Sequence, residues 1–178
     1  MESPETPLDP TQSVVLRGCA EELLPRVPSA SVRLILTDPP YNVSRPNNFH
    51  TMGRTGIDFD WDGDFDQVAW LEEAERVLVP GGSIVIWNDW KNLGELARAL
   101  TGLGFSVKAK LTWSKRNPMP RNRDRSFVPR EEHALWAVKP GGKRKWIFNR
   151  DPSRAYEDGV FSYPIPRGRK GRPRHQAK

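Results

Sequence analysis

The chain has 178 residues, enough for one domain with a hydrophobic core, and its seven Trp and seven Phe are typical of a globular protein. A single Cys excludes a disulfide framework and a multi-cysteine metal site. The acidic, proline-rich residues 1–7 do not resemble a signal peptide, and no apolar run of about 18 residues is present, so we expect a cytoplasmic location.

Charge is divided unevenly along the chain. Residues 1–114 carry 10 Lys and Arg against 16 Asp and Glu, whereas residues 115–178 carry 18 against 6. A basic segment of this kind predicts a polyanionic partner, most often nucleic acid. A solvated basic tail is the alternative.

Apolar periodicity predicts alternating strands and helices, which is typical of a doubly wound α/β sheet. In the first part of the chain we expect a strand at 13–17, helical turns at 19–26, a strand at 32–37 and a long loop at 42–63. A helix follows, begun by Asp64 or Asp66 and ended by Pro80 to Gly82, and then a strand at 83–87 and a helix at 93–103. Strands at 105–113 and 132–138 and a short strand at 145–148 complete the expected elements. The remainder has no periodicity and is interpreted as a basic irregular tail.

Thr37-Asp38-Pro39-Pro40-Tyr41 follows the apolar strand at 32–37 directly. Two consecutive prolines end a strand, because neither nitrogen donates a hydrogen bond and both fix φ. A carboxylate, backbone carbonyls and an aromatic ring are therefore held at the carboxyl end of a buried strand, where α/β sheets bind ligands. A simple Pro-Pro turn that leaves the strand is the alternative interpretation of this stretch alone.

Several stretches in the same order resemble a family of enzymes. These are Gly18-Cys19-Ala20, the run from Ser31 to Tyr41, Glu73 to Ser83, Trp113 to Pro120, and Glu131 to Lys139. Together they resemble the β-class of S-adenosylmethionine-dependent DNA amino-methyltransferases, which modify N6 of adenine or N4 of cytosine. The resemblance implies a partial Rossmann-like methyltransferase sheet with helices on both faces, a basic C-terminal segment, S-adenosylmethionine as cofactor and double-stranded DNA as substrate.

The resemblance assigns the chemistry to Asp38, Pro39, Pro40 and Tyr41. An exocyclic amine is a poor nucleophile because its lone pair is delocalised into the base. The carboxylate of Asp38 and the carbonyl of Pro39 can accept its two N–H bonds, which favours a tetrahedral nitrogen aimed at a methyl donor. Tyr41 can stack on a base flipped out of the duplex, and such stacking contributes ~1–3 kcal/mol. D-P-P-Y, rather than S-P-P-Y, implies adenine N6.

The resemblance also implies cofactor contacts and shows two departures. Gly18, Cys19, Ala20, Asp38 and Lys178 correspond to cofactor-binding positions, but Cys19 stands where the family usually has an Asp that binds the adenine amine. The sequence has no F-x-G-x-G loop for the methionine part of the cofactor, and residues 174–178 stand where the family has H-P-T-Q-K-P. We therefore expect a complementary chain that carries this loop, or a homodimer partner.

Two further stretches have competing interpretations. Lys115, Arg116, Asn117, Arg121, Arg123 and Arg125 form a basic loop that predicts contacts with DNA phosphates and base edges. The aspartates from Asp58 to Asp66 are spaced like a calcium loop, but Ala69 occupies the twelfth position, where a bidentate Glu is needed, so a solvated loop is favoured.

The sequence as a whole predicts three parts: a flexible lead at 1–11, a catalytic-half domain at 12–150, and a basic tail at 151–178. We expect a DNA adenine-N6 methyltransferase, split or truncated. A non-catalytic DNA-binding remnant or regulatory subunit, and an N4-cytosine methyltransferase, stay open as alternatives.

Overall fold

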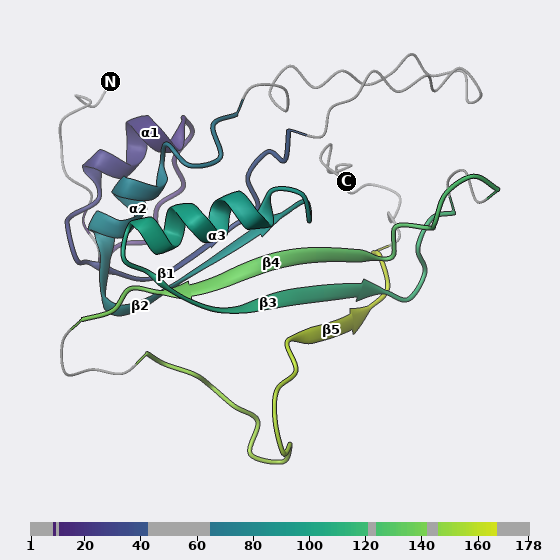
Figure 1. The fold of residues 1–178 in the computed structure, drawn as a ribbon. Helices are drawn as coiled ribbons and strands as arrows, with labels where there is room; N and C mark the ends of the chain where they lie inside the picture. The colour runs from purple at the N-terminus through teal and green to yellow at the C-terminus, as the bar shows by residue number, and fades with distance from the viewer. Residues whose placement is uncertain (1–8, 10, 43–64, 121–123, 142–145, 167–178) are drawn as a thin grey trace.

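The computed structural model describes residues 9, 11–42, 65–120, 124–141 and 146–166. Its elements are α1 (Ala20–Leu23), the 3-10 turn η1 (Leu24–Arg26), β1 (Val32–Thr37), α2 (Leu71–Val77), β2 (Leu78–Asn88), α3 (Leu93–Gly102), β3 (Ser106–Lys115), β4 (Glu131–Val138) and β5 (Val160–Tyr163). The strands form one mixed sheet in the order β1-β2-β4-β3-β5 (Figure 1). β1 and β2 are parallel, as are β3 and β5, whereas β4 is antiparallel to both neighbours.

The strand pairing brings several strand ends to one edge of the sheet. Thr37 of β1 lies opposite Ile86 of β2, and Asn88 at the end of β2 lies opposite His133 of β4, which also pairs with Thr112 of β3. We call this the site edge: the carboxyl ends of β1, β2, β3 and β5, together with the start of β4. The loop after β1 therefore leaves the sheet where ligands of α/β proteins bind.

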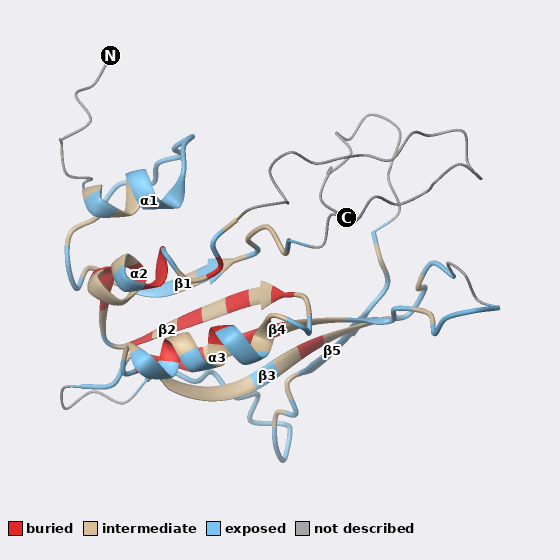
Figure 2. Ribbon diagram, turned by 45° about the horizontal axis from the view of Figure 1, so that its top comes forward, coloured by how far each residue is buried: buried red, intermediate tan, exposed pale blue. Residues whose placement is uncertain are grey.

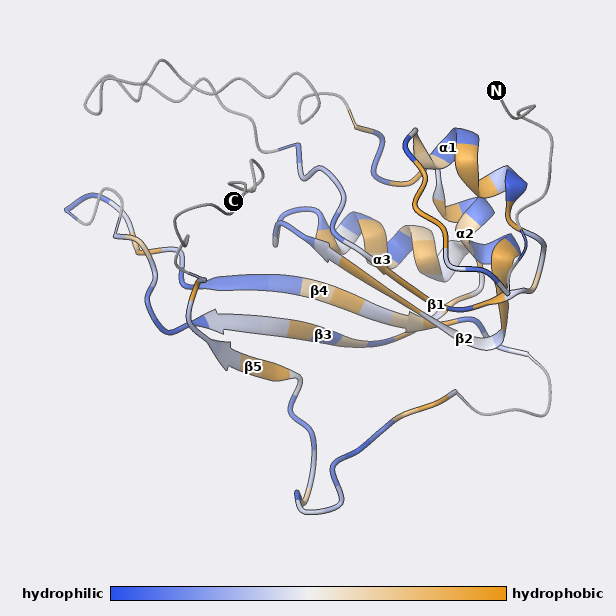
Figure 3. Ribbon diagram, turned by 180° about the vertical axis from the view of Figure 1, so that it is seen from behind, coloured by the Kyte–Doolittle hydropathy of each residue, from blue (hydrophilic) through white to orange (hydrophobic). Residues whose placement is uncertain are grey.

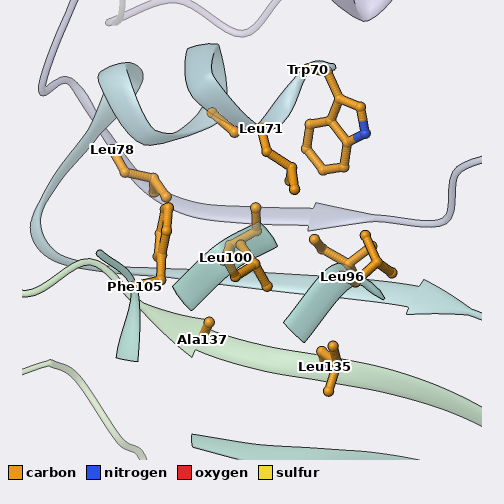
Figure 4. Packing of buried hydrophobic residues seen from close by; sticks show 11 residues of the cluster. Trp70, Leu71, Leu78, Leu96, Leu100, Phe105, Leu135 and Ala137 are labelled. Atoms are coloured by element: carbon orange, nitrogen blue, oxygen red, sulfur yellow. The ribbon is translucent and has the colours of Figure 1, made fainter. Parts of the chain in front are cut away.

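The hydrophobic core lies between the sheet and the helices α2 and α3. Leu71 of α2 and Leu96 and Leu100 of α3 are fully buried, and Figure 4 shows the two α3 leucines close to Leu135 and Ala137 of β4. The spacing of four residues places both α3 leucines on one stripe of that helix. Burial alternates along β2, as Figure 2 shows, because successive side chains of a strand point to opposite faces.

The opposite face of the sheet is covered less completely. Leu34 and Leu36 of β1 are 55% and 65% exposed. Phe148 stacks on Trp136 of β4 with ring centroids 5.5 Å apart, so the segment after β4 covers part of this face. Helices on both faces were expected; in the described residues α2 and α3 share one face.

Most expected elements are confirmed. The helical turns at 19–26, the strands at 32–37, 83–87, 105–113 and 132–138, and the helix at 93–103 all occur within two residues of their predicted bounds, apart from the start of β2, which lies earlier, at Leu78. The helix predicted to begin at Asp64 or Asp66 and to end at Pro80 to Gly82 is shorter: α2 begins after its N-cap Trp70 and ends at Val77. Asp66 instead holds the turn before α2, since its Oδ1 accepts from the backbone N–H of Val68 at 2.9 Å and of Ala69 at 3.0 Å. Gly104, at φ 85°, closes α3.

Two predicted strands are wrong and one strand was missed. Residues 13–17 have no regular secondary structure and belong to no strand of the described sheet, in which β1 is the terminal strand, and Val15 is fully exposed. Residues 146–148 are not a strand; Trp146 instead lies under the ammonium of Lys108, 3.9 Å from the ring centroid. β5 was not predicted because its four residues are all exposed and show no alternation. It extends the sheet into the segment assigned to the tail, 151–178.

Hydropathy changes along β4, which begins with hydrophilic residues at the site edge and becomes hydrophobic toward its end (Figure 3). The start of β4 therefore faces the polar loops, while its end belongs to the core. Among the described residues, no helix has the length and apolar character needed to span a membrane.

Candidate active site

The D-P-P-Y turn lies at the site edge, directly after β1. The hydroxyl of Tyr41 donates a short hydrogen bond to Oδ1 of Asp38. Burial of the phenol, then its bond to Asp38 and the nearby charges of Asp38, Glu132 and Asp89, raise the pKa of Tyr41 far above its usual value. The phenol therefore keeps its proton and holds the Asp38 carboxylate at one position.

Amide side chains hold the backbone of the same turn. Nε2 of Gln67 donates to the carbonyl of Pro40 at 2.7 Å, and Nδ2 of Asn92 donates to the carbonyl of Tyr41 at 2.8 Å. Asn42, at φ 53°, exchanges two bonds with the backbone of Phe65: its Nδ2 donates to the carbonyl at 2.6 Å, and its Oδ1 accepts from the N–H at 3.1 Å. The turn is thus held at Pro40, Tyr41 and Asn42 before any ligand binds.

A cavity of about 770 Å³ adjoins the turn. It lies between α1 and η1 on one side and the end of β1 and the start of α2 on the other. Its lining includes Gly18, Cys19 and Ala20, the three predicted cofactor-binding residues near the N-terminus, together with Pro39 and Pro40. The volume is within the range of about 300–1,000 Å³ found for small-molecule sites.

Trp70 also lines this cavity and carries an unusual feature. It is 5% exposed, and among the described residues its Nε1 is the one buried side-chain polar atom without a hydrogen-bond partner. Figure 4 shows this nitrogen on the side of the indole that points away from Leu71 and the labelled leucines of the core. An unsatisfied buried donor costs about 1–3 kcal/mol, so such a group marks a candidate ligand contact.

The opposite wall of the cavity is tied to α2 by one side chain. The Arg76 guanidinium donates to the hydroxyl of Ser29 at 2.8 Å and to the carbonyls of Leu24 and Val27 at 3.0 and 2.9 Å. It also bonds Glu73, three residues earlier on α2, at 2.8 Å. Cys19 is the N-cap of α1 and makes no capping bond with its side chain.

The structure assigns local partners to two residues of the predicted DNA-binding loop. Nζ of Lys115 lies 2.6 Å from a carboxylate oxygen of Glu132, and both side chains are mostly buried. The Asn117 amide holds the backbone of Ile165, accepting from its N–H at 2.5 Å and donating to its carbonyl at 3.3 Å. Arg116 and Arg125 are exposed, as is Phe127, which is 98% exposed in the same loop.

Several predicted residues lie outside the described residues: Arg121, Arg123, Lys178 and most of the aspartate loop, including Asp58, Asp60, Asp62 and Asp64. Their roles stay predictions.

Sequence reasoning missed Gln67, Asn88, Asn92, Trp70 and Arg76 as site residues. None of them belongs to a spacing pattern, because they come from different elements and meet only in the folded chain. The sequence offered one signal, a polar residue at a predicted strand end, because Asn88 follows directly after the apolar residues 84–87.

The mixed sheet, with a D-P-P-Y turn at the carboxyl end of its first strand, defines a Rossmann-like methyltransferase fold. Residues 32–161 match the model of the N6 and N4 methyltransferases, described as DNA methylase. The chain belongs to this DNA methylase family.

Relatives and solved structures agree with this assignment. The type II methyltransferase M.HinfI of Haemophilus influenzae is 31% identical over 147 residues, which cover 77% of this chain and 41% of the relative. The type II methyltransferase M2.LlaDCHI of Lactococcus lactis subsp. cremoris is 29% identical over 157 residues, covering 83% and 58%. The chain thus spans about half the length of these curated relatives.

Among solved structures, the crystal structure of M1.HpyAVI in complex with SAM superposes with a TM-score of 0.63 at 29% identity, covering 85% of this chain and 64% of that chain. The cytosine-N4-specific PvuII DNA methyltransferase superposes with a TM-score of 0.56 at 18% identity and covers 86% of this chain and 58% of its own. The latter likeness supports the fold alone.

Proposed function

We propose that this chain forms the base-binding part of a DNA methyltransferase that transfers a methyl group from S-adenosylmethionine to N6 of an adenine flipped out of the duplex. The observation that carries the proposal is the D-P-P-Y turn at the site edge, with Tyr41 bonded to Asp38 and the backbone held from both sides.

The geometry of the turn suits a site that accepts hydrogen bonds from an amine. Within the described residues no hydrogen bond is made to the carbonyl of Pro39, the residue that follows Asp38. This carbonyl and the Asp38 carboxylate can accept the two N–H bonds of the amine and direct its lone pair outward. Because a carboxylate has lone pairs for several donors, Asp38 can bind the amine and the Tyr41 hydroxyl together. The Tyr41 ring then provides a surface on which the base stacks.

The cavity beside the turn fits the cofactor. It brings Gly18, Cys19 and Ala20 next to Pro39 and Pro40, its walls are mainly apolar, and the unpaired N–H of Trp70 lines it. These residues would hold the adenosine part of S-adenosylmethionine, which supplies an electrophilic methyl group on a sulfonium. Lys178 belongs to the same proposal through the resemblance alone.

The choice of adenine rests on the D-P-P-Y motif. The family to which the chain belongs includes enzymes for N4 of cytosine as well as N6 of adenine. Mass spectrometry of nucleosides from treated DNA distinguishes the two, and N4-methylcytosine would contradict the adenine assignment.

DNA is proposed to lie against the basic loop between β3 and β4. Arg116 and Arg125 are exposed there and available to phosphates, and Arg121 and Arg123 belong to the same loop. Lys115 is paired with Glu132, and the side chain of Asn117 holds Ile165, so we expect these two to contribute mainly by shaping the loop.

A complementary chain that carries the F-x-G-x-G loop is the partner that best suits the uncovered side of β1; a homodimer is the alternative. In the described residues β1 is the terminal strand, and its Leu34 and Leu36 are largely exposed. A parallel strand paired to β1, with a helix packed on these leucines, would bury them as α/β sheets require.

The test is methyl transfer to DNA by the chain, alone and with any co-encoded partner, compared with Asp38→Ala. We expect the substitution to lower the rate at least about 100-fold, because it removes an acceptor that acts on the reacting nitrogen. DNA affinity is expected to stay within a few-fold of the wild type. An active Asp38→Ala protein would contradict the mechanism.

The second candidate function is a non-catalytic DNA-binding or regulatory subunit, and the departure at Cys19 favours it. Calorimetric titration with S-adenosylhomocysteine separates the two functions. DNA binding without any cofactor binding, alone or with a partner, would support this second function.

A further inference from the structure

Three amide side chains form a continuous hydrogen-bonded chain behind the D-P-P-Y turn. Nδ2 of Asn88 donates to Oε1 of Gln67 at 2.7 Å, and Nδ2 of Asn92 donates to Oδ1 of Asn88 at 2.7 Å. The outer members reach the turn, Gln67 at the carbonyl of Pro40 and Asn92 at the carbonyl of Tyr41. We call Gln67, Asn88 and Asn92 the amide relay.

The direction of every bond in the relay is forced by its ends. A backbone carbonyl only accepts, so Gln67 must present its nitrogen to Pro40 and its oxygen to Asn88. Asn88 must then give its nitrogen to Gln67, and its oxygen accepts from the backbone N–H of Asp89 at 2.8 Å as well as from Asn92. Asn92 uses the same nitrogen for the relay and for Tyr41. One arrangement satisfies all these groups, so the relay is rigid.

Burial and a missing cap indicate that the relay does more than stabilise its own elements. Asn88 is 1% exposed and Gln67 7% exposed, which is uncommon for amides. Asn92 is the N-cap residue of α3 but makes no capping bond with its side chain. A cap contributes about 1 kcal/mol, and here that contribution is replaced by a contact with the loop of another strand.

We propose that Gln67, Asn88 and Asn92 are positioning residues that set the direction of the Tyr41 ring, and through it the Asp38 carboxylate, for the incoming base. The carbonyls of Pro40 and Tyr41 belong to the two peptide planes on either side of the Tyr41 Cα. When both planes are fixed, φ and ψ of Tyr41 are fixed as well. These angles fix the direction of the Tyr41 Cα–Cβ bond and limit the rotamers of the ring, and the bond of its hydroxyl to Asp38 selects one of them.

The relay as an aid to catalysis rests on the proposed function, but its effect on Tyr41 is measurable without any methyl transfer. The chain has three tyrosines, and the other two, Tyr156 and Tyr163, are 73% and 60% exposed. With 3-fluorotyrosine incorporated, ¹⁹F NMR gives a separate signal for each ring, so the Tyr41 ring can be followed by itself.

The first variant is Asn92→Asp, which places oxygens against two acceptors, the carbonyl of Tyr41 and Oδ1 of Asn88. We expect the Tyr41 signal to shift, whereas the signals of Tyr156 and Tyr163 stay at their wild-type positions. Asn149→Asp, at an exposed position, makes the same charge change and is expected to leave all three signals as they are.

The second variant, Gln67→Glu, supplies a pH-dependent rescue. A protonated carboxyl can donate to the carbonyl of Pro40 and accept from Asn88, whereas a carboxylate cannot donate. The Tyr41 signal is therefore expected at the wild-type position at low pH and displaced once the introduced carboxyl ionises. If the substitution only destabilised the loop, protonation of the introduced carboxyl would not return the Tyr41 signal to its wild-type position.

An unchanged Tyr41 signal in both folded variants would overturn the proposal. In the enzyme assay, we expect kcat to fall about 10- to 100-fold in Asn92→Asp, with DNA affinity within about three-fold of the wild type. If the wild type transfers no methyl group under any condition, the proposed function fails, while the NMR result still decides the role of the relay.

Discussion

The turn at residues 38–42 and the cavity wall at residues 18–27 face each other across one site, yet they are built differently. The turn is held by side chains from the end of β2, the start of α3 and the segment before α2, all anchored in the core. The wall consists of α1, which buries no residue, and η1, fastened to α2 by the Arg76 guanidinium. The chain therefore preorganises the turn, the proposed base side, more completely than the cavity wall, the proposed cofactor side.

This difference agrees with how apolar surface is distributed. The face of the sheet under α2 and α3 is buried, and the relay grows from that rigid region. The uncovered face of β1, with Leu34 and Leu36, lies on the side where a cofactor-binding partner is proposed. Leu34 and Leu36 lie on the face opposite the cavity, which is lined by Ile35 and Trp70, so a partner that covers these leucines would support β1 from behind the site.

The largest expected effect comes from Arg76, since it supports the cofactor-side wall. Arg76→Lys removes the fork that reaches Ser29 and two carbonyls, which one ammonium cannot replace. We expect urea unfolding to show a loss of about 1–3 kcal/mol, at the lower end because the side chain is 32% exposed. Affinity for S-adenosylhomocysteine should fall as the wall loosens.

Arg98→Lys on the exposed side of α3 is the matched control and should leave stability within about 0.5 kcal/mol. Equal losses in the two variants would show that Arg76 does not hold the wall in solution.

A replacement at Trp70 tests whether the cavity binds the cofactor. Benzothienylalanine keeps the fused rings but carries sulfur in place of the indole N–H. Because that N–H has no partner, its removal should leave the free energy of unfolding unchanged or raise it by about 1 kcal/mol. S-adenosylhomocysteine should bind about 5- to 10-fold more weakly by calorimetry, since a neutral hydrogen bond contributes about 1 kcal/mol.

The same replacement at Trp90, which is 66% exposed, serves as the control and should change neither quantity. Unchanged cofactor affinity in the Trp70 variant would mean that the N–H does not contact the ligand.

The two sides also differ in how much of them the sequence predicts. Periodicity locates the strands at 32–37 and 132–138 and the helix at 93–103, and the motif places Asp38 and Tyr41 at a strand end. Gln67 and Asn88 are 21 residues apart and acquire a shared role only through the folded sheet. The strand expected at 13–17 fails because β propensity needs a neighbouring strand, and the described sheet has none beyond β1.

Tyr41→Phe is expected to have the smallest effect, and the pH dependence of its stability tests the base side. Its pKa is raised in the folded state by burial and by its bond to Asp38, so the folded protein favours the neutral phenol. The bond should stabilise the wild type over Tyr41→Phe by about 1 kcal/mol at neutral pH. As pH rises above about 10, the unfolded chain ionises first, so this advantage should shrink and then reverse, whereas Tyr41→Phe avoids that loss.

Urea unfolding of the two proteins at neutral pH and above pH 10 measures this difference. Tyr156→Phe, at a 73% exposed position, controls for general alkaline destabilisation and should track the wild type. A difference that stays constant with pH would mean that Tyr41 titrates alike in the folded and unfolded chain. The phenol-carboxylate bond would then add no stability to the base side, whose rigidity would rest on the amide relay alone.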